Sequence, residues 1–226
     1  MKIQNTNTLK FTNFNCLIIG KSGVGKTTLA KTIFGKTIVV SLESGLLALK
    51  DCNIDYIEIA GINGIEKVEN FRSIIKSLSV SDYENIFIDS LSELAQCFVE
   101  VASNEFPEDS KALKKWGLYN EMMTKMVKFI RDMNKNVFFT CLEKTEKDEA
   151  NRRFIVPDLP GSISHKLPQY FDCVLAYITF EKDGEKVRKL LTDSTQTYTA
   201  KDRSGKLLQL EEPDLSKIIE KIYGNP

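Results

Sequence analysis

Residues 20–28 are Gly20-Lys21-Ser22-Gly23-Val24-Gly25-Lys26-Thr27-Thr28, and this stretch decides the fold of the 226-residue chain. It matches the phosphate-binding pattern G-x-x-x-x-G-K-S/T at every fixed position. The apolar run Cys16-Leu17-Ile18-Ile19 before it predicts a buried parallel strand. Residues 29–34 after it predict the first turns of a helix, which Gly35 closes. Strand, glycine loop and helix in this order bring backbone N–H groups and a helix N-terminus to one polyphosphate.

The loop therefore predicts a site for a nucleoside triphosphate, with ATP and Mg²⁺ as cofactors. We expect all nine residues from Gly20 to Thr28 to line it. Lys26 would reach the β- and γ-phosphates, and the Thr27 hydroxyl would bind Mg²⁺. The alternative is a chance glycine-rich turn.

Length and composition are those of one globular α/β domain, with 42% hydrophobic and 27% charged residues. Lys+Arg and Asp+Glu both number 31, so any nucleic-acid surface must be a local patch. The five cysteines have no metal-binding spacing and indicate reduced thiols in a cytoplasmic protein, or the host cytoplasm if a phage encodes it. No signal-peptide core or membrane-spanning run is present in the sequence, so we expect no membrane partner.

The rest of the chain alternates predicted strands with predicted helices. Core strands are expected at residues 37–42, 85–90 and 136–141, with an outer strand at 55–59. Helices are expected at residues 65–78, 91–101, around 122–133 and at 215–223. An Asp183-Gly184 turn predicts a hairpin between residues 172–179 and 186–192, and Tyr198 begins a further short strand.

This pattern predicts an α/β fold in one domain, residues 1–226, with a mostly parallel central sheet, flanking helices and an antiparallel hairpin at its C-terminal edge. Residues 1–14 are expected to be a short leader, with Phe11 and Phe14 packing beside the first strand. Residues 142–161 are charged and lack a period, and are expected to be a long mobile loop.

Two carboxylates follow predicted core strands. Asp89 ends the apolar run Ile86-Phe87-Ile88 and is expected to bind the water shell of Mg²⁺. Glu43 follows the strand after the phosphate loop, at the sheet edge where open α/β sheets bind ligands. A general base for an attacking water belongs there. The alternative for Glu43 is a solvated loop acid.

These segments together resemble the core of RecA-type recombinases, and most closely the phage nucleotide-binding proteins among them, the RecA-like single-strand annealing ATPases. The resemblance covers residues 14–206 and rests on the phosphate loop, Ser41-Leu42-Glu43, Asn85-Ile86-Phe87-Ile88-Asp89-Ser90-Leu91, Phe171-Asp172-Cys173-Val174 and Lys201-Asp202-Arg203-Ser204-Gly205. It implies a RecA-like fold and a slow, Mg²⁺-dependent, DNA-stimulated ATPase of homologous recombination. It also implies single-stranded DNA and a single-strand-binding protein as partners, and a homo-oligomeric ring or filament.

The resemblance gives roles to further residues. Glu43 and Lys26 would be catalytic, and Lys201 and Arg203 would act on the nucleotide of a neighbouring subunit. RecA-type proteins carry a Gln or His sensor after the fourth core strand. This chain has Thr140-Cys141-Leu142-Glu143 there, so Thr140 or Glu143 would have to take that role.

Two segments are candidates for contact with DNA. Lys111, Lys114 and Lys115 adjoin the single tryptophan, Trp116, on which a base could stack. The alternative is that Trp116 packs at the end of the long helix. The second candidate, Arg152-Arg153-Phe154, lies among acidic neighbours that offset its charge.

Three other functions fit parts of the sequence. A partition- or positioning-type switch ATPase would use Lys21 early in the phosphate loop. A small-molecule kinase would use Arg152 and Arg153 as lid residues. A nucleotide-gated interaction protein would need neither DNA nor fast hydrolysis.

Overall fold

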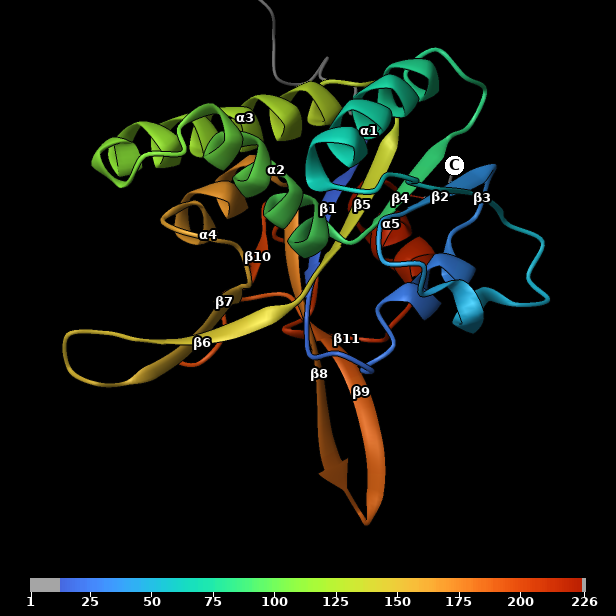
Figure 1. Cartoon of the computed structure of the whole chain (residues 1–226). Coiled ribbons are helices and arrows are strands. Elements are labelled where there is room, and N and C mark those ends of the chain that lie inside the picture. The colour runs from blue at the N-terminus through green and yellow to red at the C-terminus, as the bar shows by residue number, and fades with distance from the viewer. Residues whose placement is uncertain (1–12, 225–226) are drawn as a thin grey trace, which may run out of the picture.

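A nine-stranded sheet forms the centre of the computed structural model, which describes residues 13–224 (Figure 1). Its strand order is β11-β9-β8-β1-β5-β4-β2-β3, with β10 pairing β8 off this path. The strands are β1 (Asn15–Ile19), β2 (Thr37–Ser41), β3 (Asp55–Glu58), β4 (Asn85–Asp89), β5 (Asn136–Cys141), β8 (Cys173–Lys182), β9 (Glu185–Leu191), β10 (Lys201–Asp202) and β11 (Leu210–Glu211). The pairs from β3 to β8 are parallel, and β9, β10 and β11 pair antiparallel. The predicted fold class is confirmed.

Strand β1 lies inside the sheet because its apolar run can be buried on both faces. Leu17 and Ile19 pack into one hydrophobic cluster, and Cys16 and Ile18 pack into a second cluster on the opposite face. Its neighbours are β5 and β8. A continuous apolar run is what a strand buried on both faces requires, and the loop after β1 therefore begins at a fixed point of the sheet edge.

Helices cover the two faces of the sheet unequally. The helices α1 (Gly64–Leu78), α2 (Leu91–Glu105) and α3 (Ala112–Arg131) pack on the face of Leu17. The opposite face is covered by two 3₁₀ helices, η2 (Thr27–Thr32) and η3 (Leu46–Leu49), and by α5 (Leu215–Tyr223). The remaining helical elements of the described chain are η4 (Asp109–Lys111), α4 (Ile163–Lys166) and η5 (Leu167–Tyr170).

The predicted turn between β8 and β9 is confirmed. Asp183 and Gly184 have φ values of 53° and 81°, the left-handed pair that a tight hairpin turn needs. Phe14 is fully buried and meets Phe138 edge to face, as expected, whereas Phe11 lies outside the described residues. Within residues 13–224, no helix combines the length and the apolar character needed to cross a membrane.

The prediction of an irregular loop over residues 142–161 is wrong. Strands β6 (Glu143–Lys147) and β7 (Arg153–Pro157) form an antiparallel hairpin there. Contacts distant in sequence support it, because Ile155 N donates to Thr197 O at 2.6 Å and Thr199 N donates to Ile155 O at 3.0 Å. The short strand expected at Tyr198 is a single bridge to Ile155, and mobility of this segment stays a prediction.

The helix after the phosphate loop is also shorter than expected. It is a 3₁₀ helix that ends at Thr32, and Ile33 is already extended, so Gly35 does not cap it. The helix ends early because residues at its end form hydrogen bonds with the start of α5. Phe34 N donates to Ser216 Oγ at 2.8 Å, and Leu215 N donates to Thr32 Oγ1 at 2.9 Å.

Gly64 allows α1 and α2 to approach closely, and we predict that Gly64→Ala destabilises the protein by about 1–3 kcal/mol. A Cβ at Gly64 would lie 2.8 Å from Cys97 Cα and 2.6 Å from Glu100 Oε2, and the first of these is a backbone atom that cannot move alone. Urea denaturation measures the effect. Gly117→Ala in α3 is the matched control, because apart from its own helix backbone no atom of the described residues lies within 4 Å of its Cβ position, and it should stabilise by about 0.5–1 kcal/mol. Equal effects of the two substitutions would contradict the close packing.

Candidate functional site

The carboxyl ends of four parallel strands bring the predicted site residues together. Ser41 at the end of β2 pairs with Asp89 at the end of β4, and Ile19 at the end of β1 pairs with Cys141 at the end of β5. The phosphate loop, Glu43, Asp89 and Thr140 therefore share one edge of the sheet. Sequence periodicity could place each residue at a strand end, but the strand order decides which ends are neighbours.

The glycines give the phosphate loop its shape. Gly23 and Gly25 have φ values of 74° and 106°, which other residues rarely adopt. Lys26 is 8% exposed, and its Nζ donates to the carbonyls of Gly20 and Lys21 at 2.8 and 2.9 Å. Burial lowers the pKa of Lys26. The lysine thus lies folded against the loop that is predicted to bind phosphate.

Asp89 joins the loop to two strands. It is 4% exposed, and Thr27 Oγ1 donates to its Oδ2 at 2.6 Å while Thr140 Oγ1 donates to its Oδ1. The two residues predicted to bind Mg²⁺, Thr27 and Asp89, are therefore in direct contact. Thr140, one of two candidate sensors, touches the same carboxylate.

A hydroxyl and a carboxylate are hard oxygen donors and fit Mg²⁺. In the part of the chain that the structure describes, no group of three or more His, Cys, Asp or Glu could hold a metal. Mg²⁺ in nucleotide enzymes is held by one or two protein oxygens and takes its other ligands from phosphate and water.

Glu43 is exposed at the loop after β2, and the hydroxyl of Ser90 donates to its Oε1. Ser90 is also the N-cap of α2, because its Oγ accepts from Glu93 N. Ser90 was not among the residues predicted to have a role at the site. A sequence pattern could have identified Ser90, because Ser90 and Glu93 have the spacing of a capping box, which marks the start of a helix directly after Asp89.

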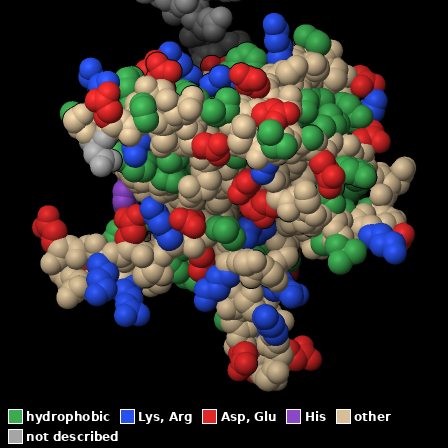
Figure 2. Space-filling model, viewed as in Figure 1, with side chains coloured by type: hydrophobic (Ala, Val, Ile, Leu, Met, Phe, Trp, Pro, Cys, Tyr) green, Lys and Arg blue, Asp and Glu red, His purple; other side chains and the backbone are tan. Residues whose placement is uncertain are grey.

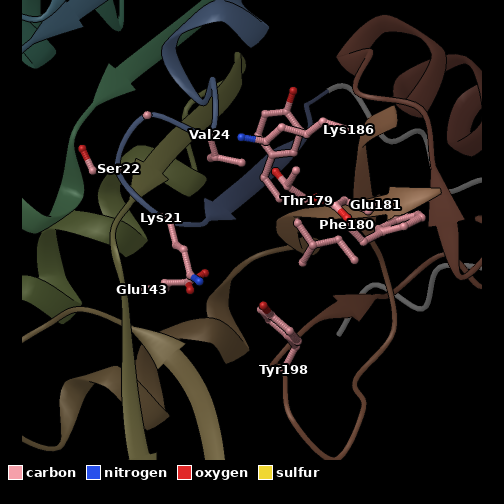
Figure 3. A pocket seen from close by; sticks show the side chains of 12 residues that line it. Lys21, Ser22, Val24, Glu143, Thr179, Phe180, Glu181, Lys186 and Tyr198 are labelled. Carbon is pink, nitrogen blue, oxygen red and sulfur yellow. The ribbon is translucent and has the colours of Figure 1, made fainter. Parts of the chain in front are cut away.

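A cavity of about 540 Å³ lies between the outer side of the phosphate loop and β8 (Figure 3). Lys21 and Glu143 point toward one another on one side of it, and Phe180 and Tyr198 lie across from the loop. Burial raises the pKa of Glu143, and Lys21 opposes this rise. Glu143 thus lines this cavity beside Lys21, whereas Glu43 accepts from Ser90 and is not among the lining residues.

Lys201 and Arg203 lie away from the phosphate loop of their own chain. Asp202 pairs with Cys173, which pairs with Cys16 at the start of β1, about 13 Å along the strand from Gly20. Lys201 Nζ donates to Pro168 O at 2.8 Å, and Arg203 donates to Asp172 Oδ1 at 3.1 Å and Gln169 O at 2.9 Å. The structure does not bring these two cations to the site.

The two segments considered for DNA contact have different environments. Trp116 is half-buried, packs on the core and meets Tyr119 edge to face at 5.8 Å. Lys115 Nζ lies 5.3 Å from the centre of the Trp116 ring. Arg152 pairs with Asp148 at 2.7 Å near the tip of the β6–β7 hairpin.

One comparison with known proteins identifies a family that includes the phosphate loop of this chain. A family model described as an AAA domain, AAA_24, matches residues 12–204. No curated protein matches the chain significantly.

Two solved structures are similar to this chain. One is a KaiC-like protein from the hyperthermophilic archaeon Pyrococcus horikoshii, with a TM-score of 0.46 and 16% identity over 78% of this chain and 76% of that one. The other is an ATPase from the type III secretion system of pathogenic bacteria, with a TM-score of 0.46 and 15% identity over 72% of this chain. This chain spans 51% of the length of that ATPase.

We predict that Lys26→Ala lowers the affinity for ATP by about 100-fold or more, because a buried charge partner of the phosphates is lost. Isothermal calorimetry measures the affinity, and thermal unfolding checks that the variant is folded. Lys31→Ala is the control, because Lys31 is exposed at the end of η2 and should leave binding unchanged. Unaltered ATP affinity in Lys26→Ala would contradict the phosphate-loop assignment.

Proposed function

Because this chain belongs to the AAA domain family whose model matches residues 12–204, we propose that it binds ATP with Mg²⁺ and hydrolyses it at the carboxyl edge of the sheet. One observation carries the proposal. The loop lysine, the contact between Thr27 and Asp89, and the contact between Ser90 and Glu43 lie at one sheet edge.

Each of these residues has a distinct task in the proposal. Lys26 exchanges the carbonyls of Gly20 and Lys21 for the β- and γ-phosphate oxygens, to which its ammonium is a stronger partner. Thr27 and Asp89 hold Mg²⁺, which when bound neutralises charge on the phosphates. Glu43 accepts the proton of the attacking water, and Ser90 orients the Glu43 carboxylate for that role.

Glu43→Gln should keep the affinity for ATP and reduce turnover by about 10²–10⁴-fold, because the amide cannot accept the proton. Steady-state phosphate release measures turnover. Glu143→Gln is the matched control, since Glu143 lines the cavity on the Lys21 side of the loop and should lose much less. A large loss in Glu143→Gln with near-normal Glu43→Gln would move the role of base to Glu143.

Single-stranded DNA is the partner that we propose from the resemblance to recombination ATPases. The support is proximity, because the β6–β7 hairpin begins two residues after β5, at the same edge as the phosphate loop. Its charge gives no support, since residues 143–157 carry four acidic and four basic residues. Acidic and basic side chains are also interspersed over the face in Figure 2. The turnover assay is therefore run with and without single-stranded DNA, and a rate that DNA leaves unchanged contradicts this partner.

We also propose that the active site is completed by a neighbouring subunit of a homo-oligomer. Phosphoryl transfer gains about 10³–10⁵ in rate from a cationic finger. Lys201 and Arg203 lie near the amino-terminal end of β1, too far to reach the loop of their own chain. Arg203 is half-exposed in its pair with Asp172, so it is accessible to another subunit.

Mixing two inactive variants tests this proposal. Glu43→Gln and Arg203→Ala should each lose turnover, and their mixture should regain part of it, because some interfaces combine an intact Glu43 with an intact Arg203. Phosphate release is measured together with size-exclusion chromatography, which shows whether the variants co-assemble. A co-assembled mixture that stays inactive, or a wild type that turns over fully as a monomer, contradicts action between subunits.

A further inference from the structure

The hydroxyl of Ser41 is the unexplained polar group of this sheet edge. Ser41 is the last residue of β2 and is 2% exposed. Its Oγ has no hydrogen-bond partner among the residues that the structure describes. Buried hydroxyls nearly always have a partner, so an exception calls for a physical reason such as a bound ion or water.

Three other buried side-chain atoms in residues 13–224 share this property, but none lies at the site. Asn15 is at the opposite end of β1, and Tyr119 and Asn120 are on α3. Among these buried groups, Ser41 is the one that lies beside a predicted metal-binding residue, Asp89.

Ser41 faces the same side of the sheet as the phosphate loop helix. Val39, two residues earlier in β2, packs with Leu29 of η2, whereas Val40 packs on the opposite face. Since strand side chains alternate, Ser41 lies on the side of Val39. Asp89 lies on this side too, because Phe87, two residues before it in β4, packs in the same cluster.

Ser41 and Asp89 are also direct neighbours across the two strands. They are paired in register, and adjacent strands lie about 4.8 Å apart. Asp89 accepts from Thr27 and Thr140, whereas the Ser41 hydroxyl makes no hydrogen bond to this carboxylate. Glu43 follows Ser41 by two residues along the chain.

We propose that Ser41 is a positioning residue whose Oγ accepts a hydrogen bond from a water of the Mg²⁺ shell. This inference rests on the proposed function. Mg²⁺ keeps several of its waters in nucleotide sites, and metal-bound waters are strong hydrogen-bond donors that need acceptors around them. With a hydroxyl beside Asp89, the water shell is oriented toward the side where Glu43 stands.

The test separates this role from a purely structural one. Calorimetry measures the affinity of Ser41→Ala for ADP in Mg²⁺ and in EDTA, and thermal unfolding measures the stability of the nucleotide-free protein. We expect equal affinity to wild type in EDTA, about 10-fold weaker affinity in Mg²⁺, and an unfolding temperature that is unchanged or raised. The last result follows because the substitution removes a buried polar group that has no partner.

Ser164→Ala is the matched control. Ser164 is equally buried, but its Oγ donates to Gly161 O at 3.1 Å, away from the site. Its loss should lower the unfolding temperature and leave the Mg²⁺ dependence of ADP binding intact, which is the reverse of Ser41→Ala.

Two outcomes overturn the inference while leaving the proposed function standing. One is an affinity of Ser41→Ala equal to wild type in both conditions. The other is an equal loss in Mg²⁺ and in EDTA, which would mean that the hydroxyl shapes the loop or touches the nucleotide. A wild-type protein that binds no nucleotide in either condition contradicts the proposed function itself, and this inference with it.

Discussion

The arrangement of this site depends on one buried carboxylate. Asp89 accepts from Thr27 of the phosphate loop and from Thr140 of β5, so three segments distant in sequence meet at a single side chain. A carboxylate that is 4% exposed is stable only with such donors. Its two hydrogen-bond partners are neutral hydroxyls, and the nearby cation, Lys26, directs its ammonium to the carbonyls of Gly20 and Lys21. The negative charge of Asp89 is what a divalent cation requires.

Glu43 and Asp89 have opposite environments although both follow core strands. Asp89 is enclosed and bonded on both oxygens, whereas Glu43 is exposed and bonded through Oε1 to Ser90. Asp89 and Ser90 are consecutive in the chain, and through them the end of β4 supplies one carboxylate and holds the other, that of Glu43. Asp89 is enclosed beside the loop, and Glu43 is open to solvent.

The β8 strand relates the site to the rest of the molecule. Its Tyr177 approaches the loop so closely that a Cβ at Gly20 would lie 2.9 Å from the Tyr177 carbonyl. Near its other end, β8 pairs with β10, which carries Lys201. The long hairpin of β8 and β9 then extends past the sheet beside the cavity of the phosphate loop (Figures 1 and 3). Strand β8 therefore contacts the phosphate loop near one end and, near the other end, pairs with the strand that carries Lys201.

The sequence by itself determined the central strands and the identity of the phosphate loop. Continuous apolar runs such as Cys16–Ile19 are typical of strands that a parallel sheet buries on both faces, and the Asp183-Gly184 turn fixes its hairpin locally. Tertiary structure decided the rest. The β6–β7 hairpin needs Thr197 and Thr199, and the early end of the loop helix needs Ser216, partners more than 40 residues away. The contact of Ser90 with Glu43 also depends on strand order, as does the Ser41 hydroxyl, which has no partner among residues 13–224. Periodicity places a residue at a strand end without stating which other strand ends lie beside it.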